Sequence, residues 1–220
     1  MARDRIDGRA RVRKVNAHAQ PPRAGVLLAN LGTPDRPDAG SLRRYLREFL
    51  WDPRVVEVPR PIWWLILNLV IVPFRAPKSA EAYRRVWTER GSPLLYHTRD
   101  LAEAMEREFQ RNHPAVKVYP AMRYGRPSIA EALERMREDN VQRVIVLPMY
   151  PQYSATTTAS VFDGLAHALK RVRWIPELRL ITHYHYDEAW VEAVADRIRA
   201  HQDEHGRPEK LVFSFHGIPK

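Results

Sequence analysis

Val144-Ile145-Val146-Leu147 is the stretch that decides the fold, because this short β-type run lies between two helical patterns. On its N-terminal side, residues 129–136 carry apolar side chains at helical spacing, behind Ser128 and Glu131, a pair typical of a capping box. On its C-terminal side, the same spacing returns over residues 161–172. A strand that alternates with helices is the repeating unit of a parallel α/β sheet.

The pattern continues outward from this stretch in both directions. Further β-type runs occur at residues 25–29, 116–119, 178–181 and 211–215, and further helical spacings at residues 101–109 and 191–198. The expected fold class is therefore α/β, a parallel sheet with flanking helices. The 220 residues, 45% of them hydrophobic, are enough for one domain with a sizeable core.

The composition excludes several kinds of chemistry. The chain has no cysteine, so these residues can form no disulfide, no thiolate nucleophile and no protein-ligated iron–sulfur cluster. Any metal must bind to nitrogen or oxygen, and the usage fits a reducing cytosol. Neither G-x-G-x-x-G nor G-x-x-x-x-G-K-[ST] occurs, which disfavours a nucleotide site.

Residues 1–23 form a basic tail, with seven basic residues against Asp4 and Asp7, which is half of the formal net charge of +10. The tail has no apolar region of a secretory signal, and two aspartates without a serine argue against a mitochondrial presequence. We expect a solvated, disordered tail followed by an α/β domain over residues 24–220. No motif for reading nucleic acid accompanies the charge, so no nucleic-acid partner is expected.

Residues 62–72 are strongly apolar and lie between Pro61 and Pro73. A membrane-spanning helix needs about 20 apolar residues, so this segment is too short to span a bilayer. Two interpretations remain open. The segment is either a buried helix or, because Trp63 and Trp64 are adjacent and hard to bury together, an apolar lip beside a pocket or an interfacial patch.

In parallel sheets, ligands bind beyond the carboxyl ends of the strands, so the residues after each run should meet at one rim. That rim combines many aromatic side chains with one arginine, three histidines and very few carboxylates, which suits a planar, anionic ligand. His183 and His185 would point to opposite faces of a continued strand, so we interpret them as structural. His216 follows the last run directly before Gly217, where an imidazole suits proton or metal chemistry.

Six motifs occur in order between residues 25 and 219. They are Leu-Ala-Asn-Leu-Gly-Thr-Pro at 28–34, Tyr83-Arg84-Arg85, Gly91-Ser92-Pro93, Arg123-Tyr124, Tyr-Pro-Gln-Tyr-Ser at 150–154 and Ser-Phe-His-Gly-Ile-Pro at 214–219. Together they resemble the ferrochelatase family, whose members complete protoheme synthesis. The resemblance implies a Rossmann-like half of a chelatase fold and a lyase that inserts ferrous iron into protoporphyrin IX. Iron is then the substrate metal, and no prosthetic group is implied.

The resemblance also implies roles for individual residues. His216 matches the active-site histidine, as proton acceptor or as iron ligand. Leu31, Arg123 and Tyr124 match positions that face the porphyrin from the side opposite the histidine. Tyr150 matches a pocket residue, and Arg85 is implied to contact a propionate. Trp63 and Trp64 match an apolar lip, so we expect a cytoplasmic protein in peripheral contact with a membrane.

The family has a second α/β half that contributes a carboxylate across the pocket from the histidine, and this sequence lacks it. We therefore expect the 220-residue fragment to be inactive by itself. A cobalt or nickel chelatase acting on another tetrapyrrole is one alternative, because imidazole binds several divalent metals. A non-catalytic porphyrin or heme carrier on the same fold is another. The oligomeric state and the order of proton removal and iron binding stay open.

Overall fold

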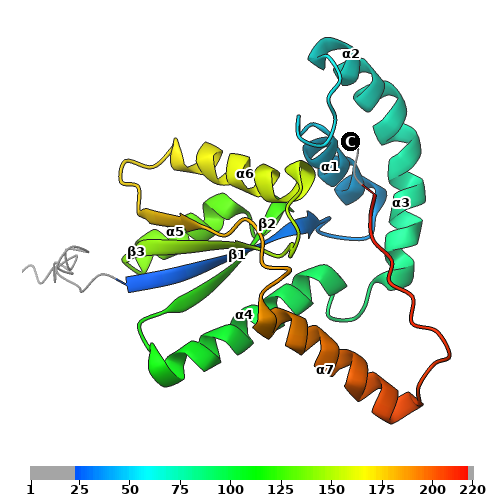
Figure 1. The fold of residues 1–220 in the computed structure, drawn as a ribbon. Helices are drawn as coiled ribbons and strands as arrows, with labels where there is room; N and C mark the ends of the chain where they lie inside the picture. Colours follow the sequence, from blue (N-terminus) through cyan, green and yellow to red (C-terminus); the bar gives the residue numbers. More distant parts are fainter. Residues whose placement is uncertain (1–22, 218–220) are drawn as a thin grey trace, which may run out of the picture.

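A computed structural model of the chain describes residues 23–217. Its four strands form one sheet in the order β2-β1-β3-β4, and every neighbouring pair is parallel (Figure 1). The strands are β1 (Arg23–Thr33), β2 (Lys117–Gly125), β3 (Val141–Pro148) and β4 (Glu177–Leu180). The α/β class and four of the five predicted strands are thus confirmed. Residues 1–22 of the predicted tail lie outside the described residues, whereas Arg23 begins β1.

Helices flank this sheet. Three of the four patterns with helical spacing fall within helices, and the fourth, residues 161–172, extends past the end of α6 at Leu169. The elements are α1 (Ala39–Leu50), α2 (Arg60–Leu65), the π-helical segment η2 (Ile66–Ile71), α3 (Val72–Val86), α4 (Pro93–Asn112), α5 (Ile129–Glu138), the π-helical segment η3 (Ala155–Ala159), α6 (Ser160–Leu169) and α7 (Glu188–His205). The predicted capping box starts α5. Its Ser128 N–H donates to Glu131 Oε2 at 2.7 Å, and the Glu131 N–H donates to Ser128 Oγ at 3.2 Å.

Strand β1 is buried on both faces of the sheet. Val26 and Leu28 pack in one apolar cluster with Ala102 of α4. Leu27 and Ala29, the alternate residues, pack in a second cluster with the inward faces of α5 and α6. Because successive side chains of a strand point to opposite faces, a continuous apolar run in β1 requires helices on both sides.

A third apolar cluster lies beyond the carboxyl ends of β1 and β2, where α1, α2 and α3 form a separate helical layer (Figure 1). Leu42 of α1, Leu67 of η2 and Val72 of α3 belong to it. Tyr124, near the end of β2, packs into the same cluster and is fully buried. The helical layer therefore stands over the rim at which the sequence predicts a ligand.

The prediction of a fifth strand at residues 211–215 is wrong. These residues form a coil that leaves the end of α7 and takes no place in the sheet (Figure 1). Leu211, Val212, Phe213 and Phe215 are 51–83% exposed. A run of β-branched and aromatic residues suits a half-buried, pleated surface. Such a run forms a strand only where a neighbouring strand completes the hydrogen-bond ladder. Helix α7 exists as predicted, but none of its residues is buried.

Two glycines allow the ends of β1 and β2 to approach closely. Gly32 has a φ of +123°, and a Cβ there would overlap the carbonyl oxygen of Tyr124. Gly125 has a φ of +84°, and its Cβ would lie 2.5 Å from the Thr33 carbonyl oxygen. The close ladder at this end of the sheet therefore depends on the missing side chains.

We predict that Gly32→Ala lowers the free energy of unfolding by at least about 2 kcal/mol, because both the positive φ and the clash with backbone oppose a Cβ. Gly91→Ala is the matched control, since Gly91 has a φ of +95° and open space where its Cβ would be. Denaturant unfolding measures both. A loss in Gly32→Ala no larger than that in Gly91→Ala contradicts the close approach.

Candidate active site

A buried carboxylate, that of Asp52, lies just after α1 where the helical layer meets the sheet. Its side chain is 2% exposed. The Oδ2 atom accepts hydrogen bonds from Arg123 Nη2 at 2.6 Å, the Tyr124 hydroxyl at 2.8 Å and Ser160 Oγ at 2.6 Å, and Oδ1 accepts from the Arg54 N–H at 2.7 Å. This one side chain therefore joins the loop after α1 to β2 and to α6.

The hydrogen bonds decide the charge state of Asp52. Burial alone would raise its pKa, because a low dielectric disfavours the ionised form. The donors Ser160 and Tyr124, the Arg54 N–H and the charge of Arg123 act in the other direction, and the pKa lies below its ordinary value. Asp52 is therefore an ionised carboxylate at neutral pH.

Arg123 is held on several sides in addition to its ion pair. Its Nε donates to the Ser160 carbonyl oxygen at 2.6 Å and to Ser160 Oγ at 2.9 Å. Its guanidinium carbon lies 4.5 Å from the centroid of the Tyr124 ring, a cation–π distance. Gly164 of α6 leaves room for the stem, because a Cβ there would lie 3.0 Å from Arg123 Cδ and Nε. The Arg123 side chain retains 18% exposure.

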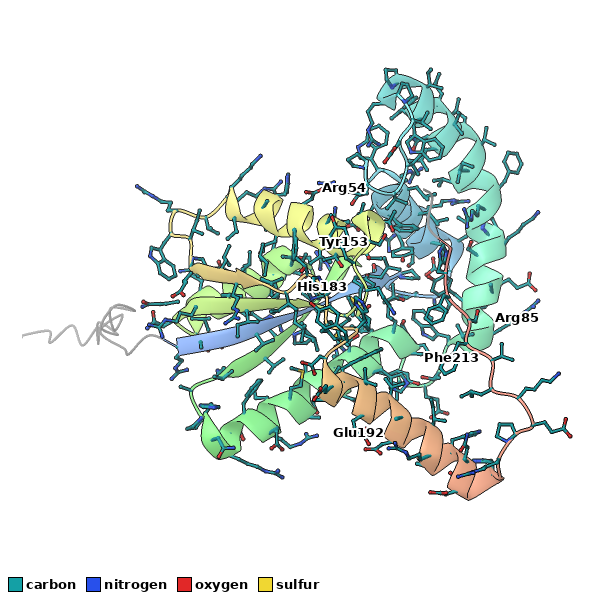
Figure 2. All side chains as sticks on the ribbon, in the orientation of Figure 1. Arg54, Arg85, Tyr153, His183, Glu192 and Phe213 are labelled. Carbon is teal, nitrogen blue, oxygen red and sulfur yellow. The ribbon has the colours of Figure 1, made fainter. Side chains whose placement is uncertain are left out.

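The exposed part of Arg123 lines a groove of about 960 Å³ between the helical layer and helices α5 and α6. Arg44, Arg47 and Arg171 also line it, and Trp51 and Trp64 contribute flat apolar surfaces. The three carboxylates of the groove are engaged. Asp52 pairs with Arg123, Asp163 pairs with Arg54 at 2.8 Å (Figure 2 labels Arg54), and Glu48 accepts from the Gly125 N–H at 3.0 Å. The groove thus offers cations beside aromatic surfaces.

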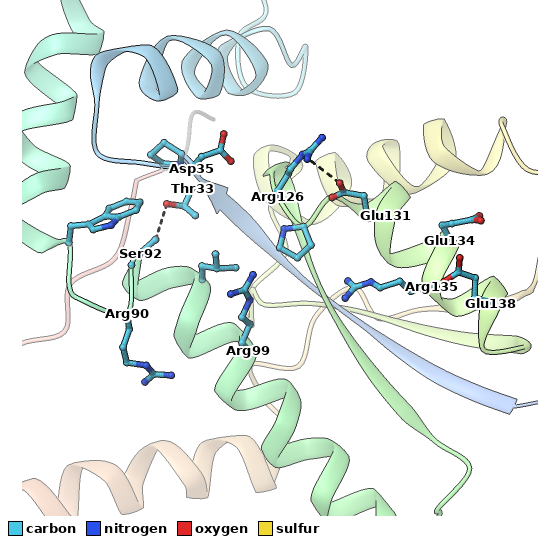
Figure 3. Close-up of a pocket in the computed structure, with 15 residues that line it drawn as sticks. Thr33, Asp35, Arg90, Ser92, Arg99, Arg126, Glu131, Glu134, Arg135 and Glu138 are labelled. Atoms are coloured by element: carbon cyan, nitrogen blue, oxygen red, sulfur yellow. Dashed lines mark hydrogen bonds and ion pairs between the residues drawn. The ribbon is translucent and has the colours of Figure 1, made fainter.

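A second pocket, of about 750 Å³, lies between the end of β1, the start of α4 and α5 (Figure 3). Its wall includes the predicted rim residue Thr33, whose hydroxyl donates to Ser92 Oγ at 2.8 Å. Four arginines and four carboxylates line it, among them Arg126 and Glu131, which pair at 3.5 Å. Because the charges balance, this pocket does not favour an anionic ligand.

His183 and His185 do not point to opposite faces, which corrects the expectation drawn from strand alternation. Strand β4 ends at Leu180, and the two ring centroids lie 5.9 Å apart. His183 Nε2 is 2.6 Å from the Tyr186 hydroxyl, and His185 Nδ1 is 3.3 Å from the Pro151 carbonyl oxygen. Within residues 23–217, no group of three or more histidine or carboxylate side chains is placed to hold a metal.

The adjacent Trp63 and Trp64 occupy different environments. Trp63 is 9% exposed, and its Nε1 donates to the Leu50 carbonyl oxygen at 2.8 Å, whereas Trp64 is 52% exposed. Consecutive helical residues point about 100° apart, so one of the pair faces the core and the expectation that both form a lip is wrong for Trp63.

The exposed side of α2, η2 and α3 forms an apolar stripe of Ile62, Trp64, Leu65, Ile66, Leu69, Val70 and Phe74. None of the helices in the described range is long and apolar enough to cross a bilayer.

Comparison with known proteins decides the kinship of the chain. The family model for ferrochelatase matches residues 23–220. The chain belongs to the ferrochelatase family. Relatives named ferrochelatase include those of Idiomarina loihiensis, 55% identical over 204 residues, Marinobacter nauticus, 55% over 206, and Thioalkalivibrio sulfidiphilus, 51% over 217. These alignments cover 92%, 92% and 98% of this chain but 56%, 55% and 58% of the relatives, so the chain spans little more than half of their length.

Three of the residues predicted to bind porphyrin lie together in this chain. Arg123 and Tyr124 share Asp52. Burial raises the pKa of Tyr150, and Tyr124 and Arg123 are close enough to act on it electrostatically. The Tyr150 hydroxyl is buried and has no hydrogen-bond partner among the described residues. Leu31, a fourth, packs against the apolar cluster of the helical layer.

Arg85 and His216 are not joined to this group by any hydrogen bond, ion pair or ring contact within residues 23–217. Arg85 is exposed and donates to Glu81 at 2.8 Å. His216 is exposed in the coil after α7, and its Nδ1 lies 2.6 Å from the Gly217 carbonyl oxygen. A carbonyl oxygen can only accept, so this contact places a proton on Nδ1. The roles of both residues stay predictions.

Sequence reasoning missed Asp52 and Ser160. The rule that selects the ends of parallel strands does not reach them, because Asp52 follows a helix and Ser160 begins one. Neither belongs to a motif of the family resemblance. The one usable signal was Arg123, since an arginine near the end of a buried strand requires a carboxylate or several carbonyls around it.

We predict that Asp52→Asn lowers the free energy of unfolding by about 3 kcal/mol at pH 7, because Arg123 loses its buried partner. The folded-state pKa of Asp52 is lowered, so the stability that its charge contributes is present above the unfolded pKa of about 3.9 and is lost as the pH falls through the folded value. The difference between wild type and variant should therefore shrink below about pH 4. Denaturant unfolding across pH 3–7 tests this, and a constant difference contradicts it.

Proposed function

We propose that the protein with this chain inserts ferrous iron into protoporphyrin IX and releases two protons from the pyrrole nitrogens, which yields protoheme. The observation that carries the proposal is the similarity to proteins named ferrochelatase over 92–98% of this chain. The arrangement of the site supports it. Aromatic surfaces and cations lie together at the groove, as a planar ligand with carboxylate substituents requires.

Rigid walls suit this reaction better than strong bases do. A planar macrocycle hides its nitrogen lone pairs, so a site that binds a bent form uses binding energy for the distortion that metal insertion requires. Arg123 is the candidate for one such wall, with the fully buried Tyr124 against its guanidinium as backing, because the positions of both are held by Asp52 and Ser160. Tyr150 and Leu31 add apolar surface, and Arg85 is the candidate for a propionate.

We propose His216 as the group that handles protons or iron. In the neutral imidazole with its proton on Nδ1, Nε2 has a lone pair that either accepts a pyrrole proton or binds the incoming ferrous ion. One nitrogen cannot hold iron and accept a proton at the same time, so these are two successive roles or alternatives.

Metal insertion by the full-length protein under anaerobic conditions tests the proposal. Ferrous iron and protoporphyrin IX should give protoheme, seen as loss of porphyrin fluorescence. Turnover with cobalt or nickel in preference to iron would instead favour the other tetrapyrrole chelatases. Porphyrin binding without any insertion would favour a carrier.

We predict that His216→Ala in the full-length protein lowers the rate of iron insertion at least about a hundredfold, the range in which a lost general base falls. Porphyrin binding and the melting temperature should stay close to wild type, because the imidazole is exposed. His201→Ala, on exposed α7, is the matched control. Near-normal turnover of His216→Ala rules out the catalytic role.

We also predict that the 220-residue chain alone binds porphyrin weakly and inserts no metal. The chain spans little more than half of its relatives, and the resemblance places the carboxylate opposite His216 in the other half. A ligand held from one side stays undistorted, and weak uniform binding does not lower the barrier to insertion. Enzyme-like turnover by residues 1–220 would show that this carboxylate is dispensable.

We propose further that the protein acts in the cytoplasm and docks on a membrane through the apolar stripe of α2, η2 and α3. The membrane would supply the apolar porphyrin.

Trp64→Ser should weaken binding to phosphatidylethanolamine and phosphatidylglycerol vesicles roughly fivefold, with a stability change within about 0.5 kcal/mol. Trp174→Ser, an equally exposed tryptophan outside the stripe, should change neither quantity. Trp63→Ser should instead cost about 3–5 kcal/mol, because Trp63 is core. Equal vesicle binding by Trp64→Ser and Trp174→Ser contradicts the docking.

A further inference from the structure

We propose that Asp52 is a positioning residue, which holds the Arg123 guanidinium in the orientation that the porphyrin meets, with the buried Tyr124 phenol as a second donor that fixes the carboxylate. The inference rests on the proposed function, because it explains how a residue assigned to the porphyrin wall is kept in place. Asp52 itself belongs to none of the six motifs, and its contacts alone bring it into the argument.

Stability by itself is a weak reason for this arrangement. Removing two charges from water is costly, and well-packed apolar side chains of similar volume often stabilise a core as well as a buried ion pair does. What apolar side chains cannot supply is direction. A carboxylate that accepts from a guanidinium and a phenol at 2.6 and 2.8 Å defines where both donors point.

The contacts around Arg123 leave it little rotational freedom. Asp52 holds Nη2, Ser160 holds Nε, Gly164 accommodates the stem, and the Tyr124 ring lies against the guanidinium. Asp52 Oδ2 and Ser160 Oγ each contact both Arg123 and Tyr124, but only Asp52 supplies the opposite charge. Loss of that charge therefore frees a cation beside the groove while the other contacts remain.

Asp52 also fixes the start of the loop that leads to the apolar stripe. Its Oδ1 accepts from the Arg54 N–H, and the Arg54 side chain makes two hydrogen bonds to Asp163 of α6, at 2.8 and 3.3 Å.

A carboxylate outside the groove supplies the matched control. Asp139 also accepts from a cation and a phenol, Lys117 Nζ at 3.0 Å and the Tyr119 hydroxyl at 2.7 Å. Asp139→Asn therefore removes a carboxylate with the same two kinds of partner without changing the groove, which makes it the control for Asp52→Asn.

The experiment measures the porphyrin KM, kcat and iron-free porphyrin binding of the full-length protein for Asp52→Asn, Asp139→Asn, Arg123→Met and the double variant Asp52→Asn with Arg123→Met. Asp52→Asn should raise the porphyrin KM about tenfold and weaken porphyrin binding equally, and Asp139→Asn should change neither more than twofold. If Asp52 acts through Arg123, the double variant should be no worse than Arg123→Met alone. Melting temperatures identify the variants that fold.

The outcomes separate the two proposals. A wild-type protein that inserts no iron overturns the proposed function. An active wild type with Asp52→Asn indistinguishable from Asp139→Asn overturns only the positioning role. Effects that multiply in the double variant also overturn it, because they show that Asp52 acts independently of Arg123. If Asp52→Asn does not fold, Ser160→Ala keeps the carboxylate but removes the hydroxyl that Arg123 and Tyr124 contact, and it should raise the porphyrin KM about threefold. An unchanged KM in that variant overturns the inference.

Discussion

A charge buried where two layers meet is the constraint on which the candidate site depends. Asp52 stays ionised at 2% exposure, so its oxygens must find donors within the protein. Those donors come from β2, from α6 and from the loop that follows α1. Once they are in place, the end of α1, the end of β2 and the start of α6 cannot shift relative to one another without leaving a charge unpaired. The rigidity of the proposed porphyrin wall follows from this requirement.

Close backbone approach adds to that rigidity. Gly32 and Gly125 let the ends of β1 and β2 lie closer than side chains would permit, and Gly164 lets Arg123 lie against α6. In each case the absence of a Cβ creates the room, so the geometry depends on glycine as strictly as on the charged residues.

The long connection between β1 and β2 explains how the groove arises. It contains α1, α2, η2 and α3, which form the helical layer over the rim, and α4, which returns to cover one face of the sheet (Figure 1). The groove lies where the helical layer meets α5 and α6. Trp64 belongs both to the groove wall and to the apolar stripe, so the surface proposed to meet a membrane is continuous with the site.

Local pattern in the sequence determined the strands 25–29, 116–119, 144–147 and 178–181, the four amphipathic helices, the capping box of α5 and the parallel α/β class, because each depends on neighbours within a few residues. The family motifs identified the kinship and predicted that Arg123, Tyr124 and Tyr150 face the porphyrin. Only the tertiary structure decided that Trp63 is core and Trp64 exposed, that residues 211–215 form no strand, and that Asp52 is the partner of Arg123. The contacts of Asp52 with Arg123 and Ser160 join segments 71 and 108 residues apart, and no local periodicity records which distant donor will satisfy a buried charge.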